Sequence, residues 1–369
     1  MVPSKDPALA AIIDAVREAS AREQALCIRA GGSKDFYGGP LIGAPLDVRP
    51  LSGISSYEPT ELVVTARAGT PLLELEAVLA EKGQCLPFEP PRFASAEVAG
   101  GTVGGMVAAG LAGPARAAVG SVRDYVLGAS LLNGRAELLS FGGQVMKNVA
   151  GYDVSRLLAG SMGMLGVICE VSLKVLPVAP ATATLRFDFD QATALRRINE
   201  WSGLPLPLQA SAWWDGILVL RLGGAAAAVA AAQRQLGGEL IPADLARAFW
   251  DGLRDQRDEF FANAAQAVAA GGTLWQLSVA STAPRIDLPG DTLIEWGGAR
   301  RWLISQAPAA QVRAAALDAR GHATLMRGGD RSQGVFAPLS APVLRVHRAL
   351  KQAFDPAAIF NRQRLHPEL

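Results

Sequence analysis

The run Gly100-Gly101-Thr102-Val103-Gly104-Gly105 decides the fold, and glycines follow it at positions 110, 113 and 120. Glycine inside an ordered domain costs backbone entropy, so such a cluster indicates that the main chain approaches something closely. A large phosphate-bearing cofactor would explain it, and close helix packing is the alternative that these residues leave open. The run is neither a Rossmann fingerprint nor a P-loop. It lacks the surrounding strand–helix–strand unit with its acidic residue, and no Gly-Lys-Ser/Thr follows.

Two further glycine turns lie on either side of this run. Upstream, the stretch 29–34 (RAGGSK) follows an apolar strand-like segment at 26–30. Successive N–H groups in such a turn can bind an anion, and Ser33 and Lys34 would add a hydroxyl donor and a cation. A simple turn is the alternative. Downstream, the stretch 160–168 (GSMGMLGVI) leads into an apolar strand and could present main-chain groups to the edge of a flat polar ring.

Predicted helices and strands alternate through the chain, which favours an α+β fold. In the first half we predict helices over 8–24, 71–83 and 153–160 and strands over 26–30, 46–50, 62–68, 122–140 and 164–176. In the second half we predict helices over 191–202, 224–236, 243–256 and 308–319 and strands near 217–222, 273–280 and 291–296. Prolines at 177, 180, 205 and 207 mark a change of character. We therefore expect a first domain over 1–177, an α+β cap over 178–340 and a tail over 341–369 that returns toward the first domain.

Composition excludes several classes of protein. The chain has 369 residues, half of them hydrophobic, with 19% charged residues and a net charge of +1. This is a globular composition without the basic surface that nucleic-acid binding requires. Three scattered cysteines are too few for a disulfide framework, a zinc site or an iron–sulfur cluster of the chain's own. No signal peptide or membrane-spanning stretch is visible, so we expect a cytoplasmic protein that reaches a membrane only through a partner.

The three glycine segments, in this order, resemble the FAD-binding (PCMH-type) domain of the vanillyl-alcohol oxidase superfamily, which consists of two α+β subdomains. More narrowly, the chain resembles the FAD-binding subunits of bacterial glycolate oxidases (glycolate dehydrogenases). The first half carries the superfamily likeness in SKDFYG (33–38), LDVRPLSGI (46–54), YEPTELVVTARAGTPL (57–72), LPFEPPRF (86–93), GGMVAAGLAGPARAAVGSVRDYVLG (104–128) and the long stretch 141–177. The second half carries the narrower likeness in DLPGDTLIEWGGARRWL (287–303), GHATL (321–325) and FAPLSAP (336–342).

The resemblance implies FAD-contacting positions. The FAD pyrophosphate would be wrapped by Ala30, Gly31, Gly32, Ser33 and Lys34 and contacted by Thr102, Gly104 and Gly105. The adenine would lie near Pro87, and the ribityl chain and ring would be bordered by Gly113, Gly120, Ser121 and Asp124. The isoalloxazine would be lined by Gly163, Gly166 and Ile168. Many relatives tether the flavin through a histidine where Ser33 stands, so non-covalent FAD is expected here. The tail stretch 360–364 (FNRQR) departs from the Asn-Pro-Gly-Arg/Lys of relatives.

The implied reaction is oxidation of a small 2-hydroxy acid such as glycolate to the 2-oxo acid, with hydride passing to the flavin. Partners would be a sister flavin subunit and an iron–sulfur subunit that leads to quinone. Weak catalytic candidates are His322 and Arg327; Arg300 and Arg301 are further possible carboxylate anchors, and Lys147 and Asn148 could face the ring. A lone histidine is more often structural, and no set of metal ligands is visible. A self-sufficient FAD-dependent dehydrogenase of another hydroxy acid or alcohol, and a non-catalytic protein that has lost FAD, are the alternatives.

Overall fold

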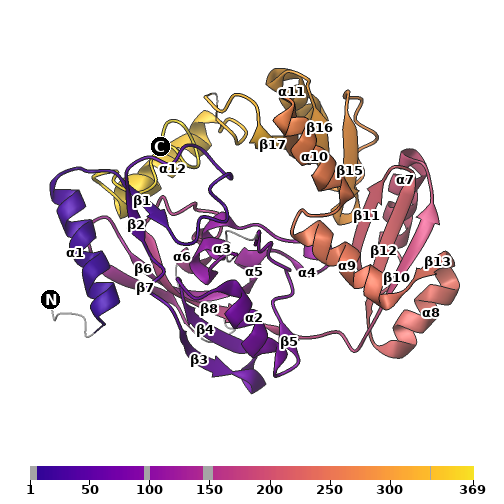
Figure 1. The fold of residues 1–369 in the computed structure, drawn as a ribbon, viewed down its shortest axis with the longest axis horizontal. Coiled ribbons are helices and arrows are strands. Elements are labelled where there is room, and N and C mark those ends of the chain that lie inside the picture. Colours follow the sequence, from indigo (N-terminus) through magenta and orange to yellow (C-terminus); the bar gives the residue numbers. More distant parts are fainter. Residues whose placement is uncertain (1–5, 95–99, 144–152, 333) are drawn as a thin grey trace.

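The computed structural model describes residues 6–94, 100–143, 153–332 and 334–369, and Figure 1 shows two large β-sheets lying side by side. The first sheet has five strands from the first half of the chain, and the second has eight strands from the second half. Helices pack against both sheets, so the predicted α+β class is confirmed.

A small unit at the N-terminus combines helix α1 (Pro7–Ala21) with the parallel strands β1 (Leu26–Arg29) and β2 (Ala44–Asp47). Asp6 caps α1 by accepting hydrogen bonds from two main-chain N–H groups of the first turn. The apolar face of α1 packs into a core that also contains Phe360 from the far end of the chain. Strand β1 ends at the glycine turn of residues 30–34, so this unit positions that turn.

The five-stranded sheet is antiparallel and has the order β3-β4-β8-β6-β7. Its strands are β3 (Ile54–Glu58), β4 (Val63–Arg67), β6 (Val126–Leu132), β7 (Leu138–Gly142) and β8 (Val167–Lys174). Helices α2 (Leu72–Ala80) and α3 (Val103–Ala109) share a core with this sheet. Short elements complete the region: η1 (Pro59–Glu61), β5 (Gln84–Cys85), α4 (Arg116–Val119), α5 (Val122–Tyr125), α6 (Val154–Leu157) and β9 (Leu176–Pro177).

Two predicted element boundaries in this region were wrong. The strand pair expected over 122–140 begins with helix α5, because the Asp124 side chain accepts the Ser121 N–H and closes a capping box. The helix expected over 71–83 spans only α2, with Pro71 as its N-cap residue. Thr70 does not cap it; its hydroxyl donates to the carbonyl of Gly53 instead.

The eight-stranded antiparallel sheet has the order β13-β10-β12-β11-β15-β16-β14-β17. Its strands are β10 (Ala181–Asp188), β11 (Leu208–Trp214), β12 (Ile217–Gly224), β13 (Glu239–Ile241), β14 (Thr273–Ser278), β15 (Asp291–Glu295), β16 (Arg300–Ser305) and β17 (His322–Gly328), with η2 (Trp296–Gly298) between β15 and β16. The helices of this half are α7 (Gln191–Ser202), α8 (Ala226–Leu236), α9 (Ala243–Arg254), α10 (Glu259–Ala269) and α11 (Ala309–Asp318). Buried Phe260, Phe261 and Trp302 fill its largest core.

The C-terminal segment crosses back to the first sheet, as Figure 1 shows in yellow. Helix α12 (Ala341–Phe354) places Phe354 against Phe141 of β7. Lys351 is buried there, where it donates to Asp355 and to the carbonyls of Met164 and Phe360. The last residues therefore lie beside β1 rather than beside the second sheet.

Candidate functional site

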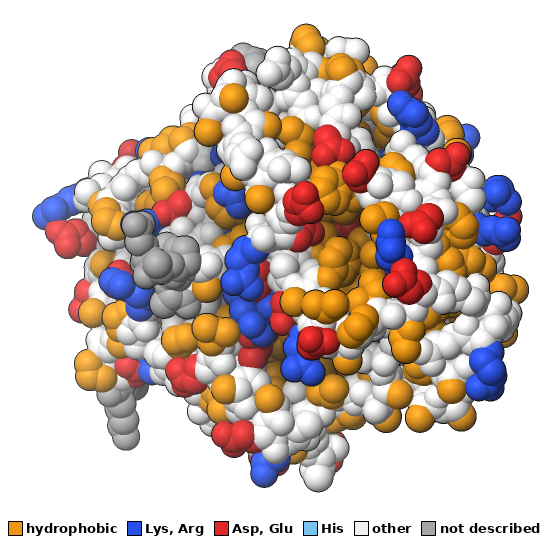
Figure 2. Space-filling view, turned by 45° about the vertical axis from the view of Figure 1, so that its right-hand side comes forward, with side chains coloured by type: hydrophobic (Ala, Val, Ile, Leu, Met, Phe, Trp, Pro, Cys, Tyr) orange, Lys and Arg blue, Asp and Glu red, His pale blue; other side chains and the backbone are white. Residues whose placement is uncertain are grey.

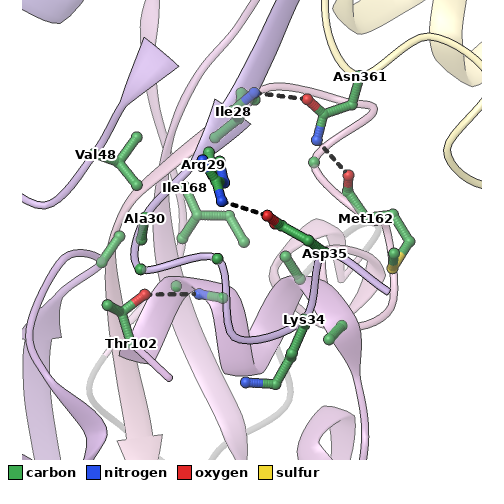
Figure 3. Close-up of a pocket in the computed structure, with 18 of the residues that line it drawn as sticks. Ile28, Arg29, Ala30, Lys34, Asp35, Val48, Thr102, Met162, Ile168 and Asn361 are labelled. Atoms are coloured by element: carbon green, nitrogen blue, oxygen red, sulfur yellow. Dashed lines mark hydrogen bonds and ion pairs between the residues drawn. The ribbon is translucent and has the colours of Figure 1, made fainter. Parts of the chain in front are cut away.

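The three glycine segments surround one pocket, although they are far apart in the sequence. Figure 3 shows the turn after β1, the start of α3 and the turn before β8 converging on it. Eleven of the sixteen predicted FAD contacts line this pocket: Ala30, Gly31, Gly32, Ser33, Lys34, Thr102, Gly104, Gly105, Gly163, Gly166 and Ile168. Val48 and Ala68, which directly follow strands β2 and β4, also line it.

Glycine is required at the start of α3 for packing as well as for access to the pocket. A Cβ added to Gly104 would lie 2.5 Å from the Cβ of Ala68, so α3 can approach the end of β4 only with glycine there. A Cβ at Gly105 would meet nothing closer than the Thr102 hydroxyl, at 3.3 Å. Thr102 caps the helix by accepting the Gly105 N–H at 3.3 Å. The cap and the glycines bring the helix N-terminus to the pocket.

The pocket wall offers hydrogen-bond donors that the described residues do not use. No acceptor among them receives the main-chain N–H groups of Gly31, Gly32, Ser33 or Lys34. Consecutive N–H groups of this kind bind phosphate oxygens. A Cβ at Gly101 would lie 2.6 Å from the Lys34 amino group, so the two glycine segments approach each other closely. These residues therefore fit a cofactor with a pyrophosphate.

Lys34 adds a cation to this wall. In the described chain its amino group has no carboxylate within ion-pair distance, and it donates to the Ser33 hydroxyl at 3.5 Å. Burial lowers the pKa of Lys34 to about 8, and the charge of Asp255 opposes this shift. Arg29 differs from Lys34, because it forms an ion pair with Asp35, drawn as a dashed line in Figure 3.

Sequence reasoning missed the contribution of the C-terminal tail. Asn361 lines the pocket, accepts the Ile28 N–H at 2.7 Å and donates to the Met162 carbonyl at 2.7 Å (Figure 3). It thus joins β1 to the turn before β8. Arg364 lines the same pocket. The signal for these residues was the asparagine and the final arginine that 361–364 shares with the Asn-Pro-Gly-Arg/Lys turn of relatives.

The other five predicted FAD contacts lie outside this pocket. Pro87 lines a groove between the two halves of the molecule. Gly113 accepts the Trp296 indole N–H through its carbonyl at 2.9 Å. Gly120, Ser121 and Asp124 build the cap of α5, where the Ser121 N–H lowers the pKa of Asp124. Their roles toward FAD stay predictions.

The candidate catalytic residues do not form one cluster. His322 is exposed at the start of β17. Arg327 stacks on Phe36, with its guanidinium carbon 3.8 Å from the ring centroid, and donates to the Gln256 amide oxygen at 3.3 Å. Lys147 and Asn148 lie outside the described residues. Within the described ranges no group of three or more potential ligands is placed to hold a metal ion.

The two other arginine candidates are held by protein groups. Arg301 is buried and donates to main-chain carbonyls of residues 283, 284 and 298. Arg300 lies 4.3 Å from the ring centroid of Trp296 and 4.2 Å from that of Trp302, and it donates to the carbonyl of Ala112. Arg300 thereby connects the second sheet to the segment after α3.

A groove runs between the two halves of the molecule, lined by α2 and β5 on one side and by α8, α9 and β10 on the other. Figure 2 shows hydrophobic side chains in a hollow near the middle of the molecule, with charged side chains around it. The charged side chains of the groove pair with one another: Arg92 forms an ion pair with Glu76, and Arg221 forms one with Glu89.

As far as the described residues extend, no helix is long and apolar enough to cross a membrane.

Comparison with known proteins shows that the chain is similar to FAD-binding proteins. Residues 8–142 match the family model of an FAD binding domain. Glycolate oxidase subunit GlcE of Escherichia coli (strain K12) is 48% identical over 359 residues, which cover 97% of this chain and 97% of that protein. Glycolate oxidase subunit GlcD of Bacillus subtilis is 30% identical over 39% of this chain and 29% of its own length. An alkyldihydroxyacetonephosphate synthase structure shares the fold with a TM-score of 0.61 at 15% identity, over 94% of this chain and 74% of its own.

Proposed function

Because this chain belongs to the family of FAD-binding glycolate oxidase subunits, we propose that it is the FAD-binding subunit of a complex that oxidises glycolate to glyoxylate. Electrons leave through the flavin and an iron–sulfur partner to an acceptor such as quinone. The GlcE and GlcD relatives are both named as subunits, which supports a complex that also contains a sister flavin subunit. The complex would lie in the cytoplasm and meet the membrane through its partners.

The observation that carries this proposal is the convergence of the three glycine segments on one pocket. The N–H groups of residues 31–34, which have no acceptor among the described residues, and the Lys34 cation would hold the FAD pyrophosphate. Gly163, Gly166 and Ile168 would line its rings. When bound, FAD would supply the hydride-accepting chemistry, and these residues would hold and orient it.

The attachment of FAD is non-covalent in this proposal. Ser33 offers no ring nitrogen to the flavin, and the chain has only His322, His347 and His366. None of these three lines the pocket.

The arrangement of the sheets supports the proposed domain division. We place the FAD-binding domain at 1–177, because β8 is the last strand in the chain to join the five-stranded sheet and β9, which follows it, pairs with β5 of the same half. The cap spans 178–340 and contains the eight-stranded sheet, and the tail spans 341–369. The relatives that match only 39–43% of the chain, such as GlcD and a D-lactate dehydrogenase of Anaerostipes hadrus, support a common flavin domain with differing remainders.

A self-sufficient dehydrogenase of another 2-hydroxy acid or alcohol is the second candidate, because the D-lactate dehydrogenase relative acts on a different hydroxy acid. The two proposals differ in what the isolated chain does. We would co-express the chain with the products of neighbouring genes, measure flavin and iron in the purified material, and assay glycolate with a dye acceptor. The complex proposal expects activity only with the partners. Full turnover by the lone chain would favour the second candidate.

A further inference from the structure

The loop of residues 34–39, which follows the glycine turn, has all six of its carbonyl groups bound by two arginines. Arg364 donates to the carbonyl oxygens of residues 34, 35, 37 and 39. Arg331 donates to those of residues 36 and 38, at 2.7 Å and 3.0 Å. Arg364 comes from the tail and Arg331 from the segment after β17, so both are about 300 residues away from the loop in sequence.

The tail lies directly on this loop. The Gly39 N–H donates to the Arg364 carbonyl at 2.8 Å. A Cβ at Gly39 would lie 2.1 Å from the Gln363 carbonyl oxygen, and one at Gly38 would lie 2.9 Å from that of Arg364. Gly38 also has a φ of +93°, which disfavours other residues. Both glycines are therefore needed for this contact.

Neither arginine uses an acidic partner. Arg364 is 5% exposed, and no carboxylate of the described chain lies within ion-pair distance of it or of Arg331. A buried guanidinium without a carboxylate needs other acceptors, and its five N–H donors suit several carbonyls at once. Burial lowers the pKa of Arg364, although nearby Cys27 and Asp35 oppose the shift. The positive charge of Arg364 is thus left for the adjoining pocket, which it lines.

These contacts orient the loop. Because the two arginines donate to all six carbonyls, we expect none of these carbonyls to be turned toward a ligand in the pocket. The preceding N–H groups of residues 31–34 meanwhile keep no acceptor within the described part of the chain. A carbonyl that faced a phosphate would repel it, so this orientation favours an anion.

We propose that Arg364, assisted by Arg331, is a positioning residue for the flavin. It holds the 34–39 loop with its carbonyls turned away from the pocket and supplies a positive charge beside the pyrophosphate. FAD binding thereby depends on docking of the C-terminal tail. This inference rests on the proposed placement of FAD at residues 31–34.

The test compares FAD affinity among variants of the full chain, measured from the loss of flavin fluorescence as flavin-free protein is titrated. Arg364→Gln should weaken FAD binding at least about tenfold, because several charge-assisted hydrogen bonds and one charge are lost. Arg331→Gln should weaken it less, about threefold, because it holds two carbonyls instead of four. Arg362→Gln is the matched control: Arg362 lies in the same tail and also donates to carbonyls, those of Ala358 and Glu23, but not to the loop.

A second measurement separates positioning from general stability. In Arg364→Ala, added guanidinium ion at low millimolar concentration should restore part of the FAD affinity, while it should leave Arg362→Ala unchanged. Arg364→Lys should fold and bind FAD with intermediate affinity, because one ammonium cannot reach four carbonyls. Wild-type affinity in Arg364→Gln or Arg364→Lys would overturn the inference. A wild-type chain that takes up no FAD, alone or with its partners, would instead overturn the proposed function.

Discussion

Lys34 is the residue that we expect to make FAD binding sensitive to pH. Its pKa is lowered to about 8 by burial, so the amino group loses its proton in the flavin-free chain as the pH rises through that value. Only the protonated form attracts the pyrophosphate. FAD affinity should therefore be constant below about pH 7 and fall about tenfold by pH 9, where roughly one Lys34 in ten is protonated. Titrations of FAD at pH 7, 8 and 9 measure this.

Two substitutions of Lys34 serve as controls for this pH dependence. Lys34→Arg keeps the charge at all three pH values, so its FAD affinity should stay flat. Lys34→Met should bind FAD more weakly at pH 7 and should also show no fall toward pH 9. A fall of the same size in Lys34→Met would assign the pH dependence to another group.

The serine at position 33 predicts that the flavin is bound without a covalent link and can be extracted. A serine hydroxyl cannot form the histidyl bond of tethered relatives, so precipitation of the yellow protein with acid should leave all flavin in the supernatant. Absorbance near 450 nm of pellet and supernatant measures the distribution. A yellow pellet that survives washing in denaturant would contradict non-covalent binding.

At the scale of elements, α3 depends on one glycine for its packing and not on the next. Gly104→Ala would force a Cβ to within 2.5 Å of that of Ala68, so α3 must move away from β4. We expect a loss of about 1–3 kcal/mol in the free energy of unfolding of the flavin-free chain. Gly105→Ala, one residue further along the same helix, meets only the Thr102 hydroxyl at 3.3 Å and should change that free energy by less than about 1 kcal/mol. Urea denaturation of both variants checks this, and equal losses would refute the packing argument.

Helices and strands were predictable from sequence where their own residues determine where they begin and end. Helix α7 has the predicted bounds, 191–202, because Asp190 caps it and apolar residues repeat on one face. Strands β10, β11, β16 and β17 were not predicted, and β11 (LQASAWW) and β17 (HATLMRG) have weak strand character of their own. They become strands by pairing within an eight-stranded sheet. Helix α10 was also missed, although Asp258 caps it.

At the scale of the whole molecule, the site also combines features that the local sequence predicts with features that depend on distant contacts. The glycine segments were predictable because close approach of the main chain leaves a local mark in the sequence. Asn361 and Arg364 were not, because the partners described above lie 199 to 333 residues away and an asparagine or arginine in a tail has many ordinary roles. Because the turn at 360–364 departs from the motif of relatives, the sequence did not predict that this segment lines the pocket.

Asp255, in the second half of the molecule, forms a hydrogen bond to the first half. Its side chain, 3% exposed, accepts the Arg92 N–H at 2.9 Å across the interface and forms ion pairs with Arg254 and Arg257. Burial alone would raise the pKa of Asp255, but the hydrogen bonds from Arg254 and the Arg92 N–H outweigh it and hold the pKa below its ordinary value. Asp255→Asn should therefore cost about 2–3 kcal/mol at neutral pH, because it leaves the buried Arg254 guanidinium with only the half-exposed Asp251 as a charge partner.

The sign of the pH dependence follows from the lowered pKa of Asp255. The stabilisation is present in full above about pH 4 and is lost as the pH falls through the pKa of the folded state. The difference in urea midpoint between wild type and Asp255→Asn should thus be constant from pH 8 to pH 5 and shrink below pH 4. Asp251→Asn is the control, since Asp251 lies on the same helix but is 45% exposed and pairs only with Arg254. Because Asp255 joins the two halves, its loss should also broaden or split the unfolding transition, whereas a transition as sharp as that of wild type would mean that other contacts hold the cap in place.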